Sequence, residues 1–557
     1  MTTLRALVLV AAAFASAVSA QSSSQQALAE ANGKMQSRDF AGAVTLLERV
    51  TAAEPSNVRA WRMFGVALQQ NNELDRAIDA YKKALALQPD MPVVLFNIGT
   101  AYARKKDADR AFEYLAKARA TKKFDMTQMQ VDADLAPFTG DPRFAELLPK
   151  AADFTNPFVE DARIIREWDG EALGDQFGWI ARDAGDIDKD GVHDVVTSAP
   201  TKVIGGGAPA GRIYVYSTKT GALLWKADGK PGDTLGIGVE SAGDTNKDGV
   251  PDVVASAPGD GYASIYSGKD GAVLRTFKAE EVSDAFGRHV SGVGDVNKDG
   301  AADVIVGAPA NNAGGKGAGR AYVYSGADGK LLLTLTGERA GDGFGAAVAG
   351  YSDGKHTFLI VGAPTAGAKH TGRTYVYDSL STTPKFVADA DDTGAALGAM
   401  FLSVPGDLNR DGTPDIYATD FPNAAKGPST GRAYVYSGTD GKPLLTLTGE
   451  TPGEGFGIGA ATMGDANGDG VADLIVGAWQ HSAQAASAGR AYLYSGKDGA
   501  LLRTITGRIP GETFGFDAVG IGDVNGDGLV DLLMTSAWSG IAGNHSGRMF
   551  VIAGTRQ

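Results

Sequence analysis

The fold of this 557-residue chain is decided by the stretch Gly294-Asp295-Val296-Asn297-Lys298-Asp299-Gly300-Ala301-Ala302-Asp303-Val304-Ile305-Val306-Gly307-Ala308-Pro309. It places carboxylate or amide oxygens at every second position, followed by a glycine, a further Asp and a short apolar strand. A degenerate copy around 352–364 keeps the strand and loses the acids. Five other full copies begin at Asp186, Asp244, Asp407, Asp465 and Asp523. Because the copies lie about 51 to 58 residues apart, they predict a repeat architecture.

The repeating unit contains four short segments of strand character, and only the last unit lacks the fourth. In the third unit, the acidic loop and its apolar strand are followed by an alternating segment at 319–326 and a fourth segment at 331–337. Four strands bounded by Gly and Asp-Gly turns make one antiparallel blade. Seven such blades predict an all-β, seven-bladed propeller over residues 161–557. Every unit opens with a large apolar residue followed by glycine, namely Phe177-Gly178, Leu235-Gly236, Phe286-Gly287, Phe344-Gly345, Leu397-Gly398, Phe456-Gly457 and Phe514-Gly515.

The two ends of the propeller region complement each other. The last unit stops after Gly554 and has no fourth strand, while an unassigned strand at 162–168 precedes the first unit. Pairing this strand with the last unit would complete the seventh blade and remove an exposed sheet edge. We therefore expect the strand at 162–168 to close the ring.

The Phe-Gly start, the Asp-x-Asn-x-Asp-Gly-x-x-Asp loop and the Gly-Ala-Pro exit together resemble the FG-GAP repeat of integrin α-subunit propellers and their bacterial relatives. This resemblance implies a propeller that acts in interaction or adhesion. The fourth unit departs from the pattern because it lacks the loop. The sixth and seventh units carry Trp479 and Trp538 where the others have proline or Phe421.

The six acidic loops predict calcium sites, about six in number. Calcium takes six to eight hard oxygen ligands from carboxylates, amides and backbone carbonyls, whereas Mg²⁺ keeps more of its water. Alternating side chains supply three ligands, the seventh residue a carbonyl, and the final Asp up to two oxygens. An ordinary turn is the alternative for one loop, but six copies in register favour metal. The predicted ligands are Asp186, Asp188, Asp190, Val192, Asp194, Asp244, Asn246, Asp248, Val250, Asp252, Asp295, Asn297, Asp299, Ala301, Asp303, Asp407, Asn409, Asp411, Thr413, Asp415, Asp465, Asn467, Asp469, Val471, Asp473, Asp523, Asn525, Asp527, Leu529 and Asp531.

Residues 22–122 show apolar residues at helical spacing that repeat about every 34 residues. The middle copy has Trp61, Gly65, Tyr81 and Pro89, with small residues where two helices must approach closely. This pattern resembles the tetratricopeptide repeat in about three copies. The resemblance implies an all-α unit with a groove for a peptide or protein, although a spacer role is the alternative. Residues 123–160 are expected to form a capping tail and linker.

The N-terminus predicts export. Residues 1–20 contain a basic start, an apolar run and small residues before Gln21, which together are typical of a cleaved signal peptide. We therefore expect a periplasmic, cell-surface or secreted protein without a transmembrane segment after cleavage. The formal net charge of −14 argues against nucleic acid as a partner. The absence of cysteine excludes disulfides and thiol catalysis.

The variable loops after the second strand of each blade are the expected ligand face, because recognition usually uses variable loops on a repeated scaffold. No catalytic motif is found, so an enzyme is not expected. The leading hypothesis is a calcium-stabilised interaction protein with a protein or glycan ligand. The alternative is a carbohydrate-directed lectin or polysaccharide lyase. The candidate ligand-face residues are Asn311, Phe421, Trp479, His481, Trp538 and Asn544, with packing between blades as the alternative role for both tryptophans.

Overall fold

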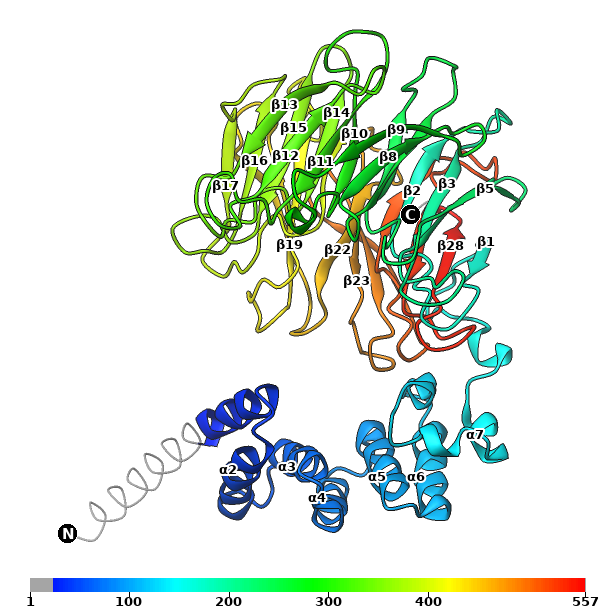
Figure 1. The fold of residues 1–557 in the computed structure, drawn as a ribbon, viewed down its shortest axis with the longest axis vertical. Helices are drawn as coiled ribbons and strands as arrows, with labels where there is room; N and C mark the ends of the chain where they lie inside the picture. The colour runs from blue at the N-terminus through cyan, green and yellow to red at the C-terminus, as the bar shows by residue number, and fades with distance from the viewer. Residues whose placement is uncertain (1–23, 556–557) are drawn as a thin grey trace, which may run out of the picture. The chain divides into compact units, whose positions relative to one another are not determined.

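The computed structural model describes residues 24–555, and the predicted signal peptide at 1–20 lies outside them. The chain forms two compact units that divide between Pro149 and Lys150. The first unit is helical, and the second is an all-β propeller (Figure 1). The two predicted fold classes, an N-terminal helical repeat and a seven-bladed propeller, are therefore both confirmed.

The helical unit consists of antiparallel pairs. Residues 24–36 are helical and pair with the next helix. Short polar residues begin several helices: Asp39 and Asn57 each accept the N–H of the residue three positions on, at 2.9 and 3.0 Å. Such N-caps satisfy amide groups that have no partner inside the helix. The helices are α2 (Phe40–Ala53), α3 (Val58–Gln70), α4 (Leu74–Leu87), α5 (Pro92–Arg104), α6 (Ala108–Ala120) and the short α7 (Pro142–Leu147).

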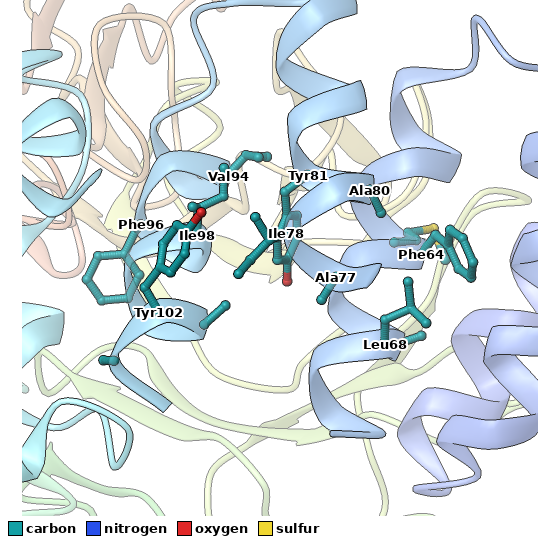
Figure 2. Packing of buried hydrophobic residues seen from close by; sticks show 14 of the residues in the cluster. Phe64, Leu68, Ala77, Ile78, Ala80, Tyr81, Val94, Phe96, Ile98 and Tyr102 are labelled. Atoms are coloured by element: carbon teal, nitrogen blue, oxygen red, sulfur yellow. The ribbon is translucent and has the colours of Figure 1, made fainter. Parts of the chain in front are cut away.

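Close contact between α3 and α4 depends on a glycine. A Cβ atom at Gly65 would lie 2.4 Å from the Tyr81 ring, so only glycine lets the buried tyrosine pack there. The Tyr81 hydroxyl donates to Gln69 Oε1 at 2.9 Å, and Gln69 Nε2 donates to Thr100 Oγ1 at 3.0 Å. This chain of bonds links α3, α4 and α5 within an apolar core (Figure 2). The small residues in the repeat therefore set the helix spacing.

The propeller has seven sheets of four antiparallel strands, and in six of them the strands follow chain order from one edge to the other. Six blades are formed by β2–β5, β6–β9, β10–β13, β14–β17, β18–β21 and β22–β25. The strands are β2 (Ala181–Gly185), β3 (Asp194–Ala199), β4 (Arg212–Tyr216), β5 (Leu223–Asp228), β6 (Val239–Gly243), β7 (Asp252–Ala257), β8 (Tyr262–Tyr266), β9 (Val273–Lys278), β10 (Val290–Gly294), β11 (Asp303–Ala308), β12 (Arg320–Tyr324), β13 (Leu331–Thr336), β14 (Val348–Ser352), β15 (Thr357–Ala363), β16 (Arg373–Asp378), β17 (Phe386–Asp389), β18 (Leu402–Gly406), β19 (Asp415–Asp420), β20 (Arg432–Tyr436), β21 (Pro443–Thr448), β22 (Phe456–Thr462), β23 (Leu474–Ala478), β24 (Arg490–Tyr494) and β25 (Leu501–Thr506).

In five units the large apolar residue before the opening glycine forms a bridge to the neighbouring blade. Phe344, for example, forms a parallel bridge with Gly319 of the preceding blade, and its ring packs edge-on against Tyr375, with ring centroids 5.3 Å apart. The following Gly345 has φ +92°, and a Cβ there would lie 2.2 Å from the Arg320 carbonyl. The glycine is therefore required both by its backbone angle and by this close approach.

The seventh blade contains both ends of the propeller region. It is formed by β26 (Ala518–Gly520), β27 (Leu532–Ser536), β28 (Arg548–Ile552) and, at its outer edge, β1 (Ile164–Asp169). The β1 strand runs antiparallel to β28, with Trp168 opposite Met549 (Figure 1). A continuous apolar cluster then joins this blade to the first one, because Val551 and Val195 are buried in the same cluster. The ring is thereby closed.

Candidate metal sites and ligand face

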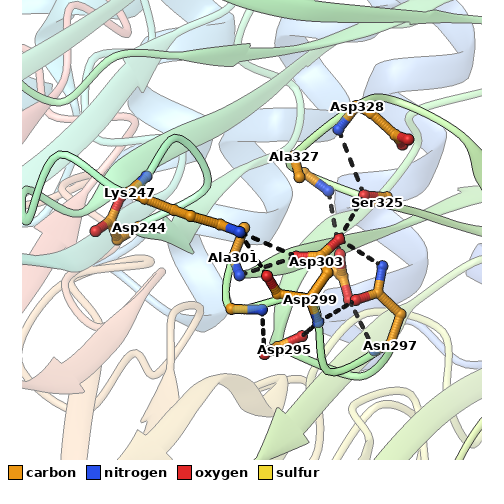
Figure 3. A network of polar contacts seen from close by, with 12 residues as sticks. Asp244, Lys247, Asp295, Asn297, Asp299, Ala301, Asp303, Ser325, Ala327 and Asp328 are labelled. Carbon is orange, nitrogen blue, oxygen red and sulfur yellow. Dashed lines mark hydrogen bonds and ion pairs between the residues drawn. The ribbon is translucent and has the colours of Figure 1, made fainter.

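The six acidic loops each connect the first and second strands of a blade, so they lie at one end of the propeller. Figure 3 shows the third loop, in which Asp295 accepts the N–H groups of Asp299 at 3.0 Å and Gly300 at 2.8 Å. The same contact from the sixth to the first residue is made in the other five loops. The first Asp therefore fixes the backbone conformation of each loop through hydrogen bonds that do not require a metal ion.

The fifth and seventh residues of every loop are joined in the same way. Ala301 donates its N–H to Asp299 Oδ1 at 3.0 Å, and Asn297 Nδ2 donates to Asp299 Oδ2 at 2.9 Å. Backbone N–H groups at the seventh position, in Val192, Val250, Thr413, Val471 and Leu529, donate to the fifth-position carboxylate of their own loops.

A fully buried Asp ends each loop. Asp303 is 0% exposed, and its Oδ2 accepts the N–H of Val296 at 2.9 Å. Its Oδ1 accepts the N–H of Gly326 at 3.1 Å, from the turn between the third and fourth strands. Burial raises the pKa of Asp194, Asp303 and Asp415 to about 6. Since a carboxylate has about four acceptor positions, Oδ1 keeps room for a metal ion after accepting one N–H.

The first loop has the most favourable donor set for a cation. Carboxylate oxygens of Asp186, Asp188 and Asp194 lie within 4.8 Å of one another. The buried Asp194 Oδ1 has no hydrogen-bond partner among the described residues. Hard oxygen donors at this spacing suit calcium. The predicted ligand positions of this loop therefore come together in a way that fits a divalent cation.

Basic side chains connect successive loops. Lys247 of the second loop reaches the third, where its Nζ donates to the Asp299 carbonyl (Figure 3). Arg410, in the loop of the fifth blade, similarly donates to the Asp469 carbonyl in the loop of the sixth blade at 2.8 Å. These contacts compensate part of the negative charge that the loops concentrate at this end of the propeller.

The residues proposed for the ligand face are largely interior. Asn311 is 3% exposed and donates to Asp284 Oδ2 at 2.7 Å; His481 and Asn544 are also buried. Trp479 and Trp538 are half-buried and pack edge-on against each other, with ring centroids 4.7 Å apart. Phe421 is half-buried as well. The two tryptophans, which follow the second strands of neighbouring blades, therefore contact each other.

Sequence reasoning missed a set of acidic pairs in the connections that enter four of the seven blades. Glu280 and Asp284 form one pair, and Glu450 and Glu454 another. Members of a pair lie four residues apart, and that spacing, repeated from unit to unit, is the signal that could have revealed them. The first member of each pair contacts the arginine that begins the third strand of its blade. Arg490 Nη1, for instance, donates to Glu450 Oε2 at 2.7 Å.

The inner strands surround a cavity of about 350 Å³. Its wall includes Arg182, which pairs with Glu240 at 2.9 Å and with the buried Asp517. These contacts join the first, second and seventh blades.

Within residues 24–555, no helix combines the length and apolar character needed to cross a bilayer.

Comparison with known proteins agrees with both repeat types. A tetratricopeptide repeat profile matches residues 28–92 and 63–125. An FG-GAP repeat profile matches 286–324, and an FG-GAP-like repeat profile matches 407–476.

Several curated proteins are similar to part of the chain. Human integrin alpha-6 is 32% identical over 161 residues, which cover 27% of this chain and 14% of that protein. Chicken (Gallus gallus) integrin alpha-8 is 30% identical over 225 residues, or 37% of this chain and 21% of that protein. Human phosphatidylinositol-glycan-specific phospholipase D is 27% identical over 403 residues, or 60% and 47%. The chain spans less than half the length of each of these relatives. It thus combines N-terminal tetratricopeptide repeats with a seven-bladed propeller of FG-GAP repeats, and it has homologues among the integrin α-subunits.

Proposed function

We propose that the protein is an exported, calcium-stabilised interaction scaffold of the adhesion type, in which the helical unit and the propeller each bind a partner. The observation that carries this proposal is the joining of two repeat folds that both suit protein–protein interaction. Similarity to integrin α-subunits supports the adhesion part. Binding, rather than turnover of a substrate, is the proposed role.

Calcium is the proposed cation of the six loops. Support comes from the repeated oxygen donors and from the unpartnered, buried Asp194 Oδ1. With a dissociation constant of ~0.1 mM and ~1 mM calcium, each site would add ~1.4 kcal/mol to the free energy of unfolding. Six sites would contribute ~8 kcal/mol, which is comparable with the whole stability of a typical domain. The ions would then be structural, because they join the first and second strands of six blades.

Adhesion can be tested with beads that carry the full chain, applied to cells of the source organism in calcium or in chelator. The proposal expects adhesion that requires calcium and is abolished when the cells are treated with protease. Loss after periodate treatment alone, which oxidises sugars, would indicate the carbohydrate-directed alternative instead. Beads that bind equally well in calcium and in chelator would contradict a calcium-stabilised scaffold.

Export can be tested on the natural protein by mass spectrometry. Cleavage after Ala20 predicts a mature chain that begins at Gln21. A mature protein that retains residues 1–20 and stays in the cytoplasm would contradict export.

A further inference from the structure

A polar contact recurs at the end of the propeller opposite the acidic loops. In each case the connection between the second and third strands supplies a donor to a carboxylate. Lys202 Nζ lies 2.7 Å from Asp175 Oδ2, and Asn311 Nδ2 donates to Asp284 Oδ2 at 2.7 Å. In other blades the donors are the Asn423 amide, 3.1 Å from Asp420 Oδ2, and the Ser539 hydroxyl, 3.2 Å from Glu512 Oε1. A direct hydrogen bond therefore closes this contact in four blades.

The sixth blade differs because its residue at this position is His481. The imidazole is 3% exposed, and its Nε2 lies 3.9 Å from both Glu450 Oε2 and Glu454 Oε2. That separation is too long for a hydrogen bond. The other ring nitrogen, Nδ1, is buried without a partner among the described residues. A buried side chain is thus directed at two carboxylates without a hydrogen bond to either.

Near neutral pH the imidazole is not protonated, so no ion pair forms between His481 and the two glutamates. Burial, together with the nearby Arg490, lowers the pKa of His481 to about 4. The neutral ring is therefore a lone-pair donor. The carboxylates of Glu450 and Glu160 lie near the ring and favour a positive charge there, whereas Arg490 opposes one. A divalent cation bound between the imidazole and the carboxylates would meet that preference.

We propose that His481, Glu450 and Glu454 form a site for a divalent transition metal, with Zn²⁺ as the best-suited ion. The three ligand atoms lie within 4.8 Å of one another. In a tetrahedral zinc site with bonds of about 2.0–2.2 Å, two ligand atoms lie about 3.4 Å apart. Each oxygen would therefore need to approach Nε2 by only about half an ångström. The mixed imidazole and carboxylate set favours zinc over calcium, which prefers oxygen alone.

Two features of the site set its expected properties. Glu450 has 45% of its side chain exposed, so an ion can enter from solvent and water can take the fourth position. Metal-bound histidines usually donate their second nitrogen to a partner, which His481 Nδ1 lacks. The site should accordingly bind zinc with micromolar affinity and not with the tighter affinity of a fully supported structural site.

The test uses the full chain in excess calcium, so that the acidic loops are occupied, followed by calorimetric titration with Zn²⁺. The wild-type protein is expected to bind one equivalent. His481→Asn should weaken that binding by more than about 100-fold, because loss of a ligand exceeds the 10–100-fold effect of losing a supporting residue. This variant should fold, since asparagine occupies the equivalent position as Asn311 and Asn423.

A matched control is His370→Asn, which changes an exposed histidine in the corresponding connection of the fourth blade and should leave zinc binding unchanged. X-ray absorption at the zinc edge gives a second measurement on the wild-type protein alone. One imidazole with oxygen ligands is expected. Unchanged zinc affinity in His481→Asn, absence of a zinc equivalent in the wild type, or a spectrum with oxygen ligands only would overturn the proposal. Because calcium is saturating throughout, these outcomes do not depend on the proposed function.

Discussion

The buried aspartate that ends each acidic loop holds backbone groups from two turns. Asp303 accepts N–H groups of Val296 and Gly326, which belong to different connections of one blade. The fifth-position residue Asp299 is more exposed and accepts mainly from within its own loop. The two carboxylates should therefore respond differently to the same substitution.

Replacing Asp303 with Asn is expected to lower the free energy of unfolding by about 2 kcal/mol with or without calcium, because either amide orientation sets an NH₂ group against a backbone N–H. Asp299→Asn keeps the local fold and should reduce only the part of the stability that depends on calcium. Urea denaturation in calcium and in EDTA measures both effects. An Asp303→Asn deficit that vanishes in EDTA would show that this carboxylate acts only through metal.

At this scale the sequence predicted much of the loop and little of the ligand face. Alternating oxygens around Asp295 could be read directly, because the loop is local. The burial of Asn311 could not, because its partner Asp284 comes from a connection 27 residues earlier and depends on blade packing. The sequence therefore favours a ligand-binding role for the polar residues of the variable loops. In the structure, several polar residues of these loops instead donate hydrogen bonds to buried carboxylates.

At the scale of the loops and strands, the fourth position of the acidic loop has a left-handed backbone. Lys247 has φ 65° and Lys298 φ 61°, whereas the loops of the sixth and seventh blades have Gly468 and Gly526 there. Lysine in this conformation costs stability relative to glycine. The Lys247 side chain reaches the acidic loop of the third blade. The blade that follows Lys298 has no acidic loop. Among the described residues, the Lys298 side chain makes no hydrogen bond or ion pair.

We expect Lys247→Gly to be less stable than Lys298→Gly by about 1 kcal/mol, the value of a hydrogen bond between loops. In both variants glycine removes the strain of the left-handed backbone and adds the same conformational entropy to the unfolded chain. The difference between their free energies of unfolding therefore measures the contact of Lys247 with Asp299. Thermal denaturation in EDTA provides the comparison. Equal melting temperatures would mean that the contact does not contribute to stability.

Strand and helix periodicity was sufficient to define the elements. Aromatic–glycine starts and Asp-Gly turns delimited the blades, and the spacing of Gly65 and Tyr81 indicated close helical pairs. The ring-closing strand was expected at 162–168 and lies at Ile164–Asp169. Its pairing with β28 also has a register irregularity between Ile164 and Arg166, which hydrophobic alternation does not reveal.

At the scale of the whole molecule, ring closure is reinforced by a buried ionic contact. Arg548 of β28 is 4% exposed, and its Nη1 donates to Glu512 Oε1 at 3.1 Å. Its Nε donates to Glu167 of β1 at 2.9 Å. Burial raises the pKa of Glu512 to about 7, although Arg548 opposes that rise. One guanidinium thus joins the first and last strands of the propeller.

Arg548→Gln should lower the free energy of unfolding by about 3 kcal/mol at pH 8, because it leaves a buried carboxylate without its partner. The deficit should shrink at pH 6: a carboxyl whose folded-state pKa is raised takes up a proton as the pH falls and loses its burial cost. Arg320→Gln removes an ion pair with the half-exposed Glu280. This variant should lower the free energy of unfolding by at most about 1 kcal/mol at either pH. Urea denaturation at both pH values measures these changes, and an equal deficit at pH 6 and pH 8 would contradict this account.

Chelation of calcium should affect the two units unequally. We expect EDTA to lower the melting temperature of the propeller, because several carboxylates in each loop then repel one another without a cation. Helical circular dichroism should report a transition of the first unit that does not move, since its stability comes from the apolar core around Tyr81. Propeller melting that is insensitive to EDTA would contradict calcium stabilisation.

The β1–β28 pairing also constrains how the protein can be made. Glu167 and Arg548, which meet in the finished blade, are separated by 381 positions along the chain. At a synthesis rate of 5–20 residues per second, β1 must wait about 20 to 75 s on the ribosome before its partner strand emerges. During that interval the helical unit can fold, while the ring of blades stays open. The ring can consequently close only after β28 has emerged, so the pairing of β1 with β28 is a late step in the folding of the propeller.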